Sequence, residues 1–442
     1  MKAVAAKLSV IVALAIGVNA FALNSCRSSA SLEQSRRESS VASASSLGEI
    51  ERVIAGLERQ INKTPTSSSL DLLARMQLSR GRITGDANSY SQAQKAINRS
   101  LSLAPKNVEG RTLDAEIRYT NHEFAAARTL SAAIVRDTPR EISALAIRAD
   151  AERELGDYSA AANTVRALQV VAAGSPAVAV RDARLRFLMG DAATADALAR
   201  RAEQSAERSG LLGTTLSFYP SFRGQLAFDA GEYKKAIEHF TRARSVAPGD
   251  RVATVGLARS LAASGEERTA LRLVQELTDR YPDPVALSLL GDLRTRVGDS
   301  KGAADAYALV EAVADLAASN RQIYDRELSL FYSNHDRNLA ESLRLARVEV
   351  DARKDVYAYD TLAWAEYKSG NFKAAESAIR RALAMNTPDA RIHFHAGMIF
   401  SKSGNSASAV RHLQIALELS PQFDVLAADA ARNELNRLGG KS

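Results

Sequence analysis

The chain has 442 residues, 46% of them apolar, which is enough material for a large or extended core. Its single cysteine excludes a disulfide framework and a thiolate metal site, so the fold must be held together by packing. The formal net charge of +7 is spread over a long chain and is a poor signal for nucleic-acid binding, so we expect no nucleic-acid partner.

Residues 1–25 are typical of an export signal. Lys2 and Lys7 flank the start of an apolar run, Leu8 to Val18, of about eleven residues, which suits a signal peptide and is too short to span a bilayer. Two cleavage sites are open. Ala20-Phe21-Ala22 fits the pattern of ordinary signal peptidase and would release a soluble protein, whereas Leu23-Asn24-Ser25-Cys26 resembles the lipobox of bacterial lipoproteins.

The lipobox resemblance implies that Cys26 becomes a lipidated N-terminus. Acyl chains, palmitate among them, on its sulfur and amino group would anchor the chain in a membrane, because stable anchoring needs two or more chains. A lone thiol has little other use in an exported chain. Arg27 follows the cysteine and, by the sorting pattern of some Gram-negative lipoproteins, favours the outer membrane. We therefore expect a lipid-anchored protein of the cell envelope that faces the periplasm.

Residues 26–46 begin with Cys26 and continue as a serine-rich tether. About half of the positions after the cysteine are serine, and large apolar side chains are almost absent. Such a composition cannot bury enough surface to offset the entropy of ordering, so we expect a flexible linker.

Past the tether, a pattern recurs about every 34 residues. The copies GEYKKAIEHFTRARSVAPGD from Gly231 and GNFKAAESAIRRALAMNTP from Gly370 both begin with glycine, place an aromatic residue two positions on and a small residue three later, and end near proline. The small residues of successive copies are Ala93, Ala127, Ala161, Ala195, Ala236, Ala270, Ala303, Ala340, Ala375 and Ala409. A second series precedes them, with Gly81, Ala115, Ala149, Gly224, Ala258, Gly291, Ala363 and Gly397.

Each copy reads as one helix-turn-helix. Two helices approach to about 8 Å only where the crossing residues are small, which explains the paired series. Glycine in the turn, as at Gly231 and Gly370, takes the left-handed conformation that ends the first helix, and His122 and His335 stand at that position in two copies. Prolines close the second helix at Pro105, Pro139, Pro248, Pro282 and Pro421.

This pattern resembles the tetratricopeptide repeat family over roughly Ala74 to Asp424. The resemblance implies an all-α fold, a right-handed superhelical solenoid of about ten repeats over residues 47–424, opened by a helix from Leu47. Residues 425–442 then form a C-terminal capping helix and tail, with Leu426, Ala430 and Leu435 facing inward. About seven extra residues separate Ala195 from Ala236, which predicts a longer loop or lengthened helices there.

Reactive groups show no recognisable catalytic spacing, so we expect no enzyme activity, no catalytic residues and no cofactor. His393 and His395 are two positions apart on one predicted helix and point to different sides, so neither they nor His412 predict a metal site.

In the tetratricopeptide family, ligands commonly lie against the concave wall lined by the first helix of each repeat. Carried over to this chain, the positions predicted to bind a partner are Tyr357, Asp360, Trp364, Tyr367, Lys368, Arg391, Phe394 and Met398. Weaker candidates farther along are Tyr119, Gln225, Phe228 and Arg259. The alternative is that these rings fill the gaps between helices.

Two binding functions follow. The first is a non-catalytic, lipid-anchored scaffold that holds a partner protein or peptide in its concave groove, like the tetratricopeptide lipoproteins that help assemble envelope or secretion complexes. The second is a carbohydrate or peptidoglycan binder that stacks sugars on Trp364 and Tyr367. A catalytic site without a recognisable motif is a third reading, with less support in the sequence.

Overall fold

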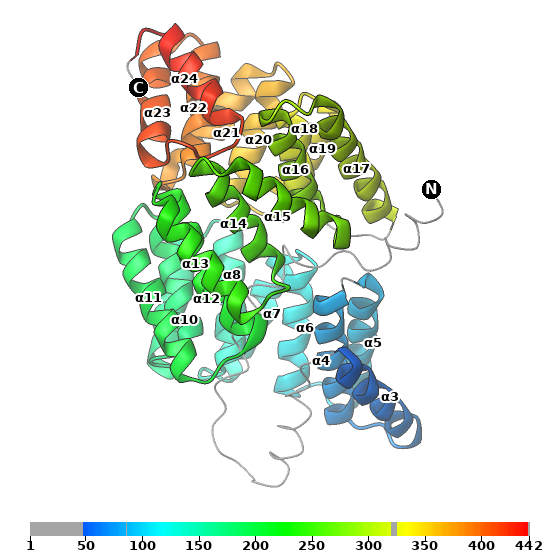
Figure 1. Ribbon diagram of the computed structural model, residues 1–442. Coiled ribbons are helices and arrows are strands. Elements are labelled where there is room, and N and C mark those ends of the chain that lie inside the picture. Colours follow the sequence, from blue (N-terminus) through cyan, green and yellow to red (C-terminus); the bar gives the residue numbers. More distant parts are fainter. Residues whose placement is uncertain (1–46, 85, 320–324, 441–442) are drawn as a thin grey trace. The chain divides into compact units, whose positions relative to one another are not determined.

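The protein is described from a computed structural model that covers residues 47–84, 86–319 and 325–440. The expected signal, the lipidated Cys26 and the tether lie outside the described residues. Within them the chain is all-α, with 22 α-helices from α3 to α24 and one short 3-10 helix, η3 (Leu383–Met385) (Figure 1).

The described chain divides into two compact units, one of residues 47–153 and 157–178 and one of residues 154–156 and 179–440. Helices of the first unit are α3 (Leu47–Lys63), α4 (Ser67–Thr84), α5 (Ala87–Leu103), α6 (Val108–Thr120), α7 (Phe124–Asp137), α8 (Ile142–Glu154) and α9 (Tyr158–Val171). Helix α10 (Pro176–Leu188) contains the boundary between the units.

The second unit continues with fourteen further helices, of which α12 to α23 pack as six pairs. These are α11 (Ala192–Arg208), α12 (Gly213–Asp229), α13 (Tyr233–Val246), α14 (Arg251–Ala263), α15 (Glu267–Arg280), α16 (Pro284–Arg296), α17 (Ser300–Ser319), α18 (Asp325–Asn334), α19 (Leu339–Ala352), α20 (Val356–Lys368), α21 (Phe372–Ala382), α22 (Ala390–Lys402), α23 (Ser406–Leu419) and α24 (Ala427–Arg437).

Neighbouring helices pack as antiparallel pairs, among them α4 with α5, α12 with α13 and α22 with α23. The predicted small residues lie at these crossings, and nine of the ten second-helix positions are buried: Ala93, Ala127, Ala161, Ala195, Ala236, Ala270, Ala303, Ala375 and Ala409. The expectation of stacked helix pairs, about ten of them, is therefore confirmed over the described residues.

The prediction for the remaining second-helix position was wrong. Ala340 is exposed, and Ser342 is fully buried at that crossing instead. The hydroxyl of Ser342 donates to the carbonyl of Ser329 over 2.8 Å, and that of Ser329 donates to the carbonyl of Ser342 over 2.9 Å. Serine can replace alanine at a crossing when its hydroxyl is satisfied in this way. Because the crossing residue is serine, the alanine predicted for this position lies two residues before it in the sequence.

The turns between paired helices contain the expected left-handed residues. Gly231 and Gly370 have φ angles of 71° and 82°, and His122 has a φ of 60°. His335 does not, since Asp336 takes the left-handed conformation with a φ of 52°. The prediction for His335 was wrong because this turn is built differently, and the imidazole points into the core instead.

Glycines also permit a close approach at the crossing of α12, α13 and α14. The ring of Phe240 on α13 is fully buried there, and a Cβ atom built on Gly224 or on Gly256 would lie 2.9 Å or 2.4 Å from it. Real Cβ contacts are longer than this. Helices α12 and α14 can therefore approach the ring so closely only because Gly224 and Gly256 have no side chains.

The extra residues between Ala195 and Ala236 lengthen two helices. Both α11 and α12 have 17 residues, against 13 or 14 in most of the other helices. Pro220 lies inside α12. The lengthened helices confirm one of the two arrangements expected for this insertion.

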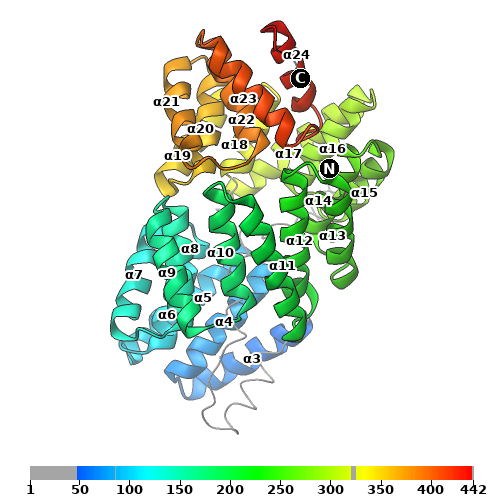
Figure 2. The ribbon, with the colours of Figure 1, turned by 90° about the vertical axis from the view of Figure 1, so that its left-hand side faces the viewer.

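Both ends of the repeat array carry an additional helix. At the start, α3 packs on α4 and buries Ile50, Ile54, Leu57 and Ile61. At the end, α24 packs on α22 and α23, as Figure 2 also shows. Its buried residues are Ala428, Ala431 and Leu435, so Leu435 was predicted correctly, whereas Leu426 and Ala430 are only partly buried. The helix begins two residues later than the predicted start, so Leu426 is its N-cap residue, and the buried face runs through Ala431 rather than Ala430.

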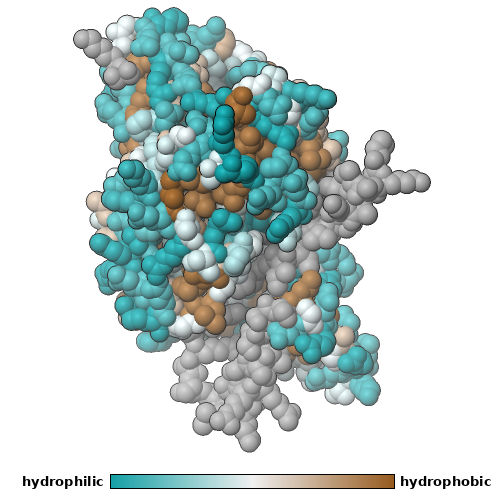
Figure 3. Space-filling model, viewed as in Figure 1, coloured by the Kyte–Doolittle hydropathy of each residue, from teal (hydrophilic) through white to brown (hydrophobic). Residues whose placement is uncertain are grey.

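None of the helices formed by the described residues combines the length and the apolar character needed to cross a bilayer. The face of the molecule in Figure 3 is mostly hydrophilic, and its apolar side chains appear in separate patches. Large apolar side chains that are exposed, such as Val170 and Leu212, occur singly along the sequence.

Candidate functional site

The first helices of successive pairs in the second unit form a continuous row, because α12 contacts α14, α14 contacts α16, and so on through α18 and α20 to α22. Side chains from several of these helices face one another. We use the term inner wall for the surface formed by Phe228, Asp229, Arg259, Asp292, Arg296, Tyr357 and Arg391.

Two residues predicted to bind a partner, Tyr357 and Arg391, lie on the inner wall, and a third, Asp360, is buried next to Arg391. Asp360 is fully buried, and its carboxylate lies 2.8 Å from Nδ1 of His395 and 3.8 Å from Nε of Arg391. Tyr357 is partly buried beside Arg326, whose guanidinium carbon lies 5.7 Å from the ring centroid. Burial raises the pKa of Tyr357, so its hydroxyl stays protonated and can donate a hydrogen bond. Tyr357 and Arg391 are partly accessible, while the buried Asp360 forms an ion pair with Arg391.

Trp364, expected to anchor a partner, lies in the core. Its exposed fraction is 5%, and its indole N–H donates to Oδ1 of Asn334 over 2.8 Å. The rings of Tyr367 and His395 stack on it with centroid distances of 4.9 Å and 4.2 Å. A buried ring can contact a partner only if the core opens, so the packing alternative describes Trp364 better. The indole does not present a free face on which a sugar could stack.

The remaining predicted residues surround this cluster. Phe394 is buried and lies 5.5 Å from the ring of Phe423, while Met398 and Tyr367 are partly buried against the same core. Lys368 forms an ion pair of 2.6 Å with Asp336. These side chains therefore stabilise the last repeats, and of the set only Tyr357 and Arg391 are brought to the inner wall.

Opposing charges meet at the C-terminal end of α12. Asp229 is the last residue of that helix and accepts a hydrogen bond of 2.7 Å from Gln225. Burial and the neighbouring carboxylate of Asp389 raise the pKa of Asp229 to about 8, although Arg259 and Arg391 oppose the shift.

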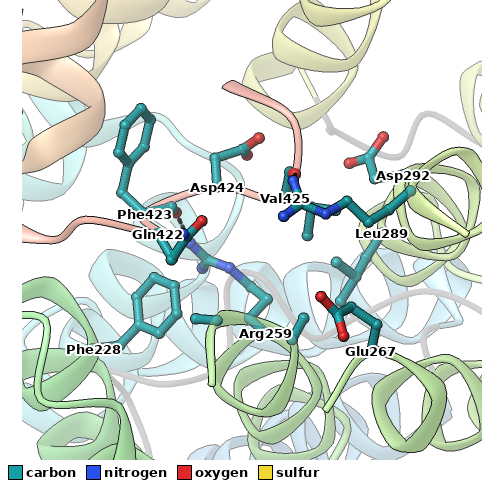
Figure 4. A pocket seen from close by; sticks show the side chains of 12 residues that line it. Phe228, Arg259, Glu267, Leu289, Asp292, Gln422, Phe423, Asp424 and Val425 are labelled. Atoms are coloured by element: carbon teal, nitrogen blue, oxygen red, sulfur yellow. Dashed lines mark hydrogen bonds between the residues drawn. The ribbon is translucent and has the colours of Figure 1, made fainter. Parts of the chain in front are cut away.

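An open pocket lies on the inner wall beside α14 and α16 (Figure 4). Two weaker sequence candidates line it, and the guanidinium carbon of Arg259 lies 4.5 Å from the ring centroid of Phe228. The opposite side is formed by the chain's own residues 422–425, which follow α23. The pocket is thus closed on one side by a non-helical stretch of the same chain.

Sequence reasoning missed a buried polar centre at the edge of this pocket. The carboxylate oxygen Oδ1 of Asp292 lies 2.7 Å from Nε2 of His335 and accepts a hydrogen bond of 2.8 Å from the hydroxyl of Tyr307. Burial raises the pKa of Asp292. The sequence marked His335 as a turn residue. Its hydrogen-bond partner, Asp292, lies 43 residues earlier on another repeat.

Histidines form pairs rather than a metal centre. Nδ1 of His393 lies 2.9 Å from Nδ1 of His412, while His395 points to Asp360, so the two helical histidines do face different sides. Burial lowers the pKa of His412 to about 4, which favours a neutral pair. Within the described residues, no group of three or more potential ligands is arranged to hold a metal ion.

Comparison with known families agrees with the repeat geometry. Two models of the tetratricopeptide repeat match residues 227–293 and 361–434. No curated protein sequence matches the chain. Three solved structures are similar to it at low identity. One is the APC/C hetero-tetramer Cut9-Hcn1, with 13% identity, 92% of this chain and 94% of that chain covered, and a TM-score of 0.32.

The second is PilW, described as a type IV pilus biogenesis factor, with 16% identity, 47% of this chain and 93% of that chain covered, and a TM-score of 0.41. The third is a tetratricopeptide repeat protein from Parabacteroides merdae, with 15% identity, 59% and 98% coverage, and a TM-score of 0.33.

Proposed function

Because this chain is a tetratricopeptide repeat protein, we propose that it is a non-catalytic interaction scaffold of the bacterial cell envelope. Tetratricopeptide repeats bind protein partners and are typically non-catalytic. In this proposal, lipid on Cys26 holds the chain at the outer membrane on the periplasmic side, the serine-rich tether gives it reach, and the inner wall of the second unit binds a peptide segment of a partner.

One observation carries the binding part of the proposal. The inner wall contacts a non-helical peptide stretch already, through side chains that bond to its main chain: Arg259 donates to the carbonyl of Phe423 over 3.4 Å, and Arg296 donates to that of Val425 over 3.1 Å. Contacts to main-chain atoms do not depend on a particular side chain. A wall with this chemistry suits a peptide ligand better than a sugar.

The wall is tested by capture of partners from envelope extracts. We expect the double variant Tyr357→Ala, Arg391→Ala to lose defined proteins that the wild type retains, because it removes the two predicted residues that remain partly accessible there. A loss of about tenfold or more in retained partner corresponds to truncation of hot-spot side chains. Retained proteins are identified and quantified by mass spectrometry.

A matched control removes the same residue types elsewhere. The double variant Arg272→Ala, Tyr281→Ala changes exposed positions at α15, a second helix, and should retain partners as the wild type does. Both variants must keep the wild-type helical circular dichroism. Equal capture by both doubles would contradict the assignment of binding to the inner wall.

The anchor is tested separately. We expect wild-type protein to incorporate labelled palmitate and to fractionate with the outer membrane, and Cys26→Ala to lose the label and leave the membrane fraction, because stable attachment requires acyl chains. The mature N-terminus is read by mass spectrometry. A chain that begins at Leu23 and carries no lipid would show that cleavage follows Ala22 and would overturn the lipid anchor.

A further inference from the structure

We propose that residues Ser420–Leu426 are a resident ligand of the inner wall, and that a partner peptide of similar chemistry binds by displacing them. The resident segment, as we call these seven residues, joins α23 to α24 and forms no helix of its own. This inference rests on the proposed function, because it names the peptide-binding part of the same wall and the condition for its use.

The resident segment is held by residues of earlier repeats. Its anchoring begins at the α12–α13 turn, where the hydroxyl of Tyr233 accepts a hydrogen bond of 2.7 Å from the main-chain N–H of Gln422 and lies 2.9 Å from the hydroxyl of Ser420. Ser420 also donates to the carbonyl of Phe228 over 3.1 Å. The partners in these bonds are up to 192 residues apart along the chain.

A close main-chain approach accompanies these bonds. A Cβ atom on Gly231 would lie 3.0 Å from the carbonyl oxygen of Leu419 and 3.3 Å from Pro421. Because Gly231 has no side chain, the main chain near Leu419 and Pro421 can pass close to this turn. The resident segment passes this turn in van der Waals contact, as a bound peptide would.

Farther along, the wall donates hydrogen bonds to two carbonyl groups of the segment that are two residues apart. Arg259 on α14 reaches the carbonyl of Phe423, and Arg296 on α16 reaches that of Val425, as Figure 4 shows for the first of these. Arg296 also forms an ion pair of 2.7 Å with Asp429 at the start of α24. Because each arginine comes from a different repeat, the wall contacts the segment at separate points along the row of first helices.

Apolar side chains of the segment pack in two directions. Val425 packs against the core of α12 to α16, while Phe423 is buried among aromatic residues of the last repeats, with Phe394 at 5.5 Å. The open pocket between them shows that the segment does not fill the wall completely. A ligand with an aromatic residue followed by an acidic and a branched aliphatic residue, like Phe423-Asp424-Val425, matches both contacts.

Attachment to the same chain makes the resident segment a strong competitor. An intramolecular segment acts at an effective concentration in the millimolar range, so a free peptide with equal contacts is largely excluded. A partner therefore gains access when the segment is loosened. This predicts low apparent affinity for short peptides in the wild type and much higher affinity once the segment is weakened.

The experiment uses the full chain and a fluorescein-labelled peptide of residues 418–429, ELSPQFDVLAAD, followed by fluorescence anisotropy. We expect a chain whose residues 420–426 are replaced by a Gly/Ser linker of equal length to bind this peptide at least about tenfold more tightly than the wild type. Adding Arg296→Ala to the linker variant should weaken binding about fivefold or more, because it removes a charged hydrogen-bond donor.

A milder variant keeps the test decisive if the linker variant does not fold. Val425→Gly removes only the side chain that packs on the wall, and it should raise peptide affinity by a smaller factor in the same direction. A peptide whose phenylalanine is changed to serine is the negative control. Equal binding by wild type and both folded variants, or binding by none of them, overturns the resident-ligand inference.

These outcomes are distinguishable from failure of the proposed function. If envelope partners are lost from the Tyr357, Arg391 double variant while the peptide fails to bind the loosened chains, the scaffold function stands and the displacement mechanism falls. If the peptide binds as expected and no partner depends on the inner wall, the segment is a purely intramolecular ligand and the scaffold function falls.

Discussion

Replacing Phe240 with alanine is expected to lower the free energy of unfolding by about 3–5 kcal/mol, the range measured for fully buried aromatic residues. The ring is 2% exposed and fills the space between Gly224 and Gly256. Neither glycine has a side chain that could move into the resulting cavity. Chemical denaturation followed by circular dichroism measures the loss.

Two further variants separate cavity formation from other effects. Phe240→Leu keeps part of the buried volume and should lose clearly less stability than Phe240→Ala. Gly256→Ala adds an atom that would lie 2.4 Å from the ring, so it should also destabilise, by about 1–3 kcal/mol, through overpacking. If neither Phe240→Leu nor Gly256→Ala changed the free energy of unfolding, the helices would not approach as closely as described.

Replacing Arg326 with leucine should cost a similar amount, about 3–5 kcal/mol, because it removes the nearest counter-charge of two buried carboxylates. Arg326 lies 2.7 Å from Glu349 and 3.3 Å from Asp355, whose side chains are 2% and 4% exposed. The contact joins the start of α18 to α19 and to the N-terminal cap of α20, where Asp355 accepts from the N–H of Ala358. Urea unfolding at pH 7 measures the loss.

The loss should also depend on pH. Burial already raises the pKa of Glu349, and removal of the arginine raises it further. A raised carboxyl pKa means that the folded state binds more protons than the unfolded state, in which the pKa is about 4.3. The deficit of Arg326→Leu should therefore be largest near pH 7 to 8 and shrink as the pH falls towards about 5.

Arg344→Leu serves as the control. Its ion pair with Glu341 lies at the surface, where the arginine side chain is 59% exposed, and such pairs contribute little. A control that loses as much stability as Arg326→Leu would contradict the buried-pair explanation.

The repeat architecture was predictable because each local requirement leaves a mark in the sequence. Helix crossings need small residues, and left-handed turns need glycine, so Ala236 and Gly231 could be identified without a structure. Where another chemistry meets the same requirement, prediction failed. The hydroxyl of Ser342 is buried and donates to the carbonyl of Ser329, and Asp336 adopts the left-handed conformation in place of His335.

The candidate site was less predictable because a helical position shows which side a residue faces but not what covers it. Trp364 stands on a first helix, yet Tyr367 and His395 enclose it. Phe228 and Arg259 line a pocket, and the carbonyl to which Arg259 donates, that of Phe423, follows 164 residues later in the sequence. Contacts at such separations depend on how the repeats curve in space, which no local pattern encodes.

The bond between Tyr233 and Gln422 has a consequence for cooperativity. In an ordinary repeat array each unit contacts only its neighbours, so terminal repeats can fray while the others stay folded. Here residues 189 positions apart are joined, and opening the last repeats also costs the contacts of α12 to α16. The second unit should thus unfold as one block, and its final closure should be slow, since distant segments must meet before the contact forms.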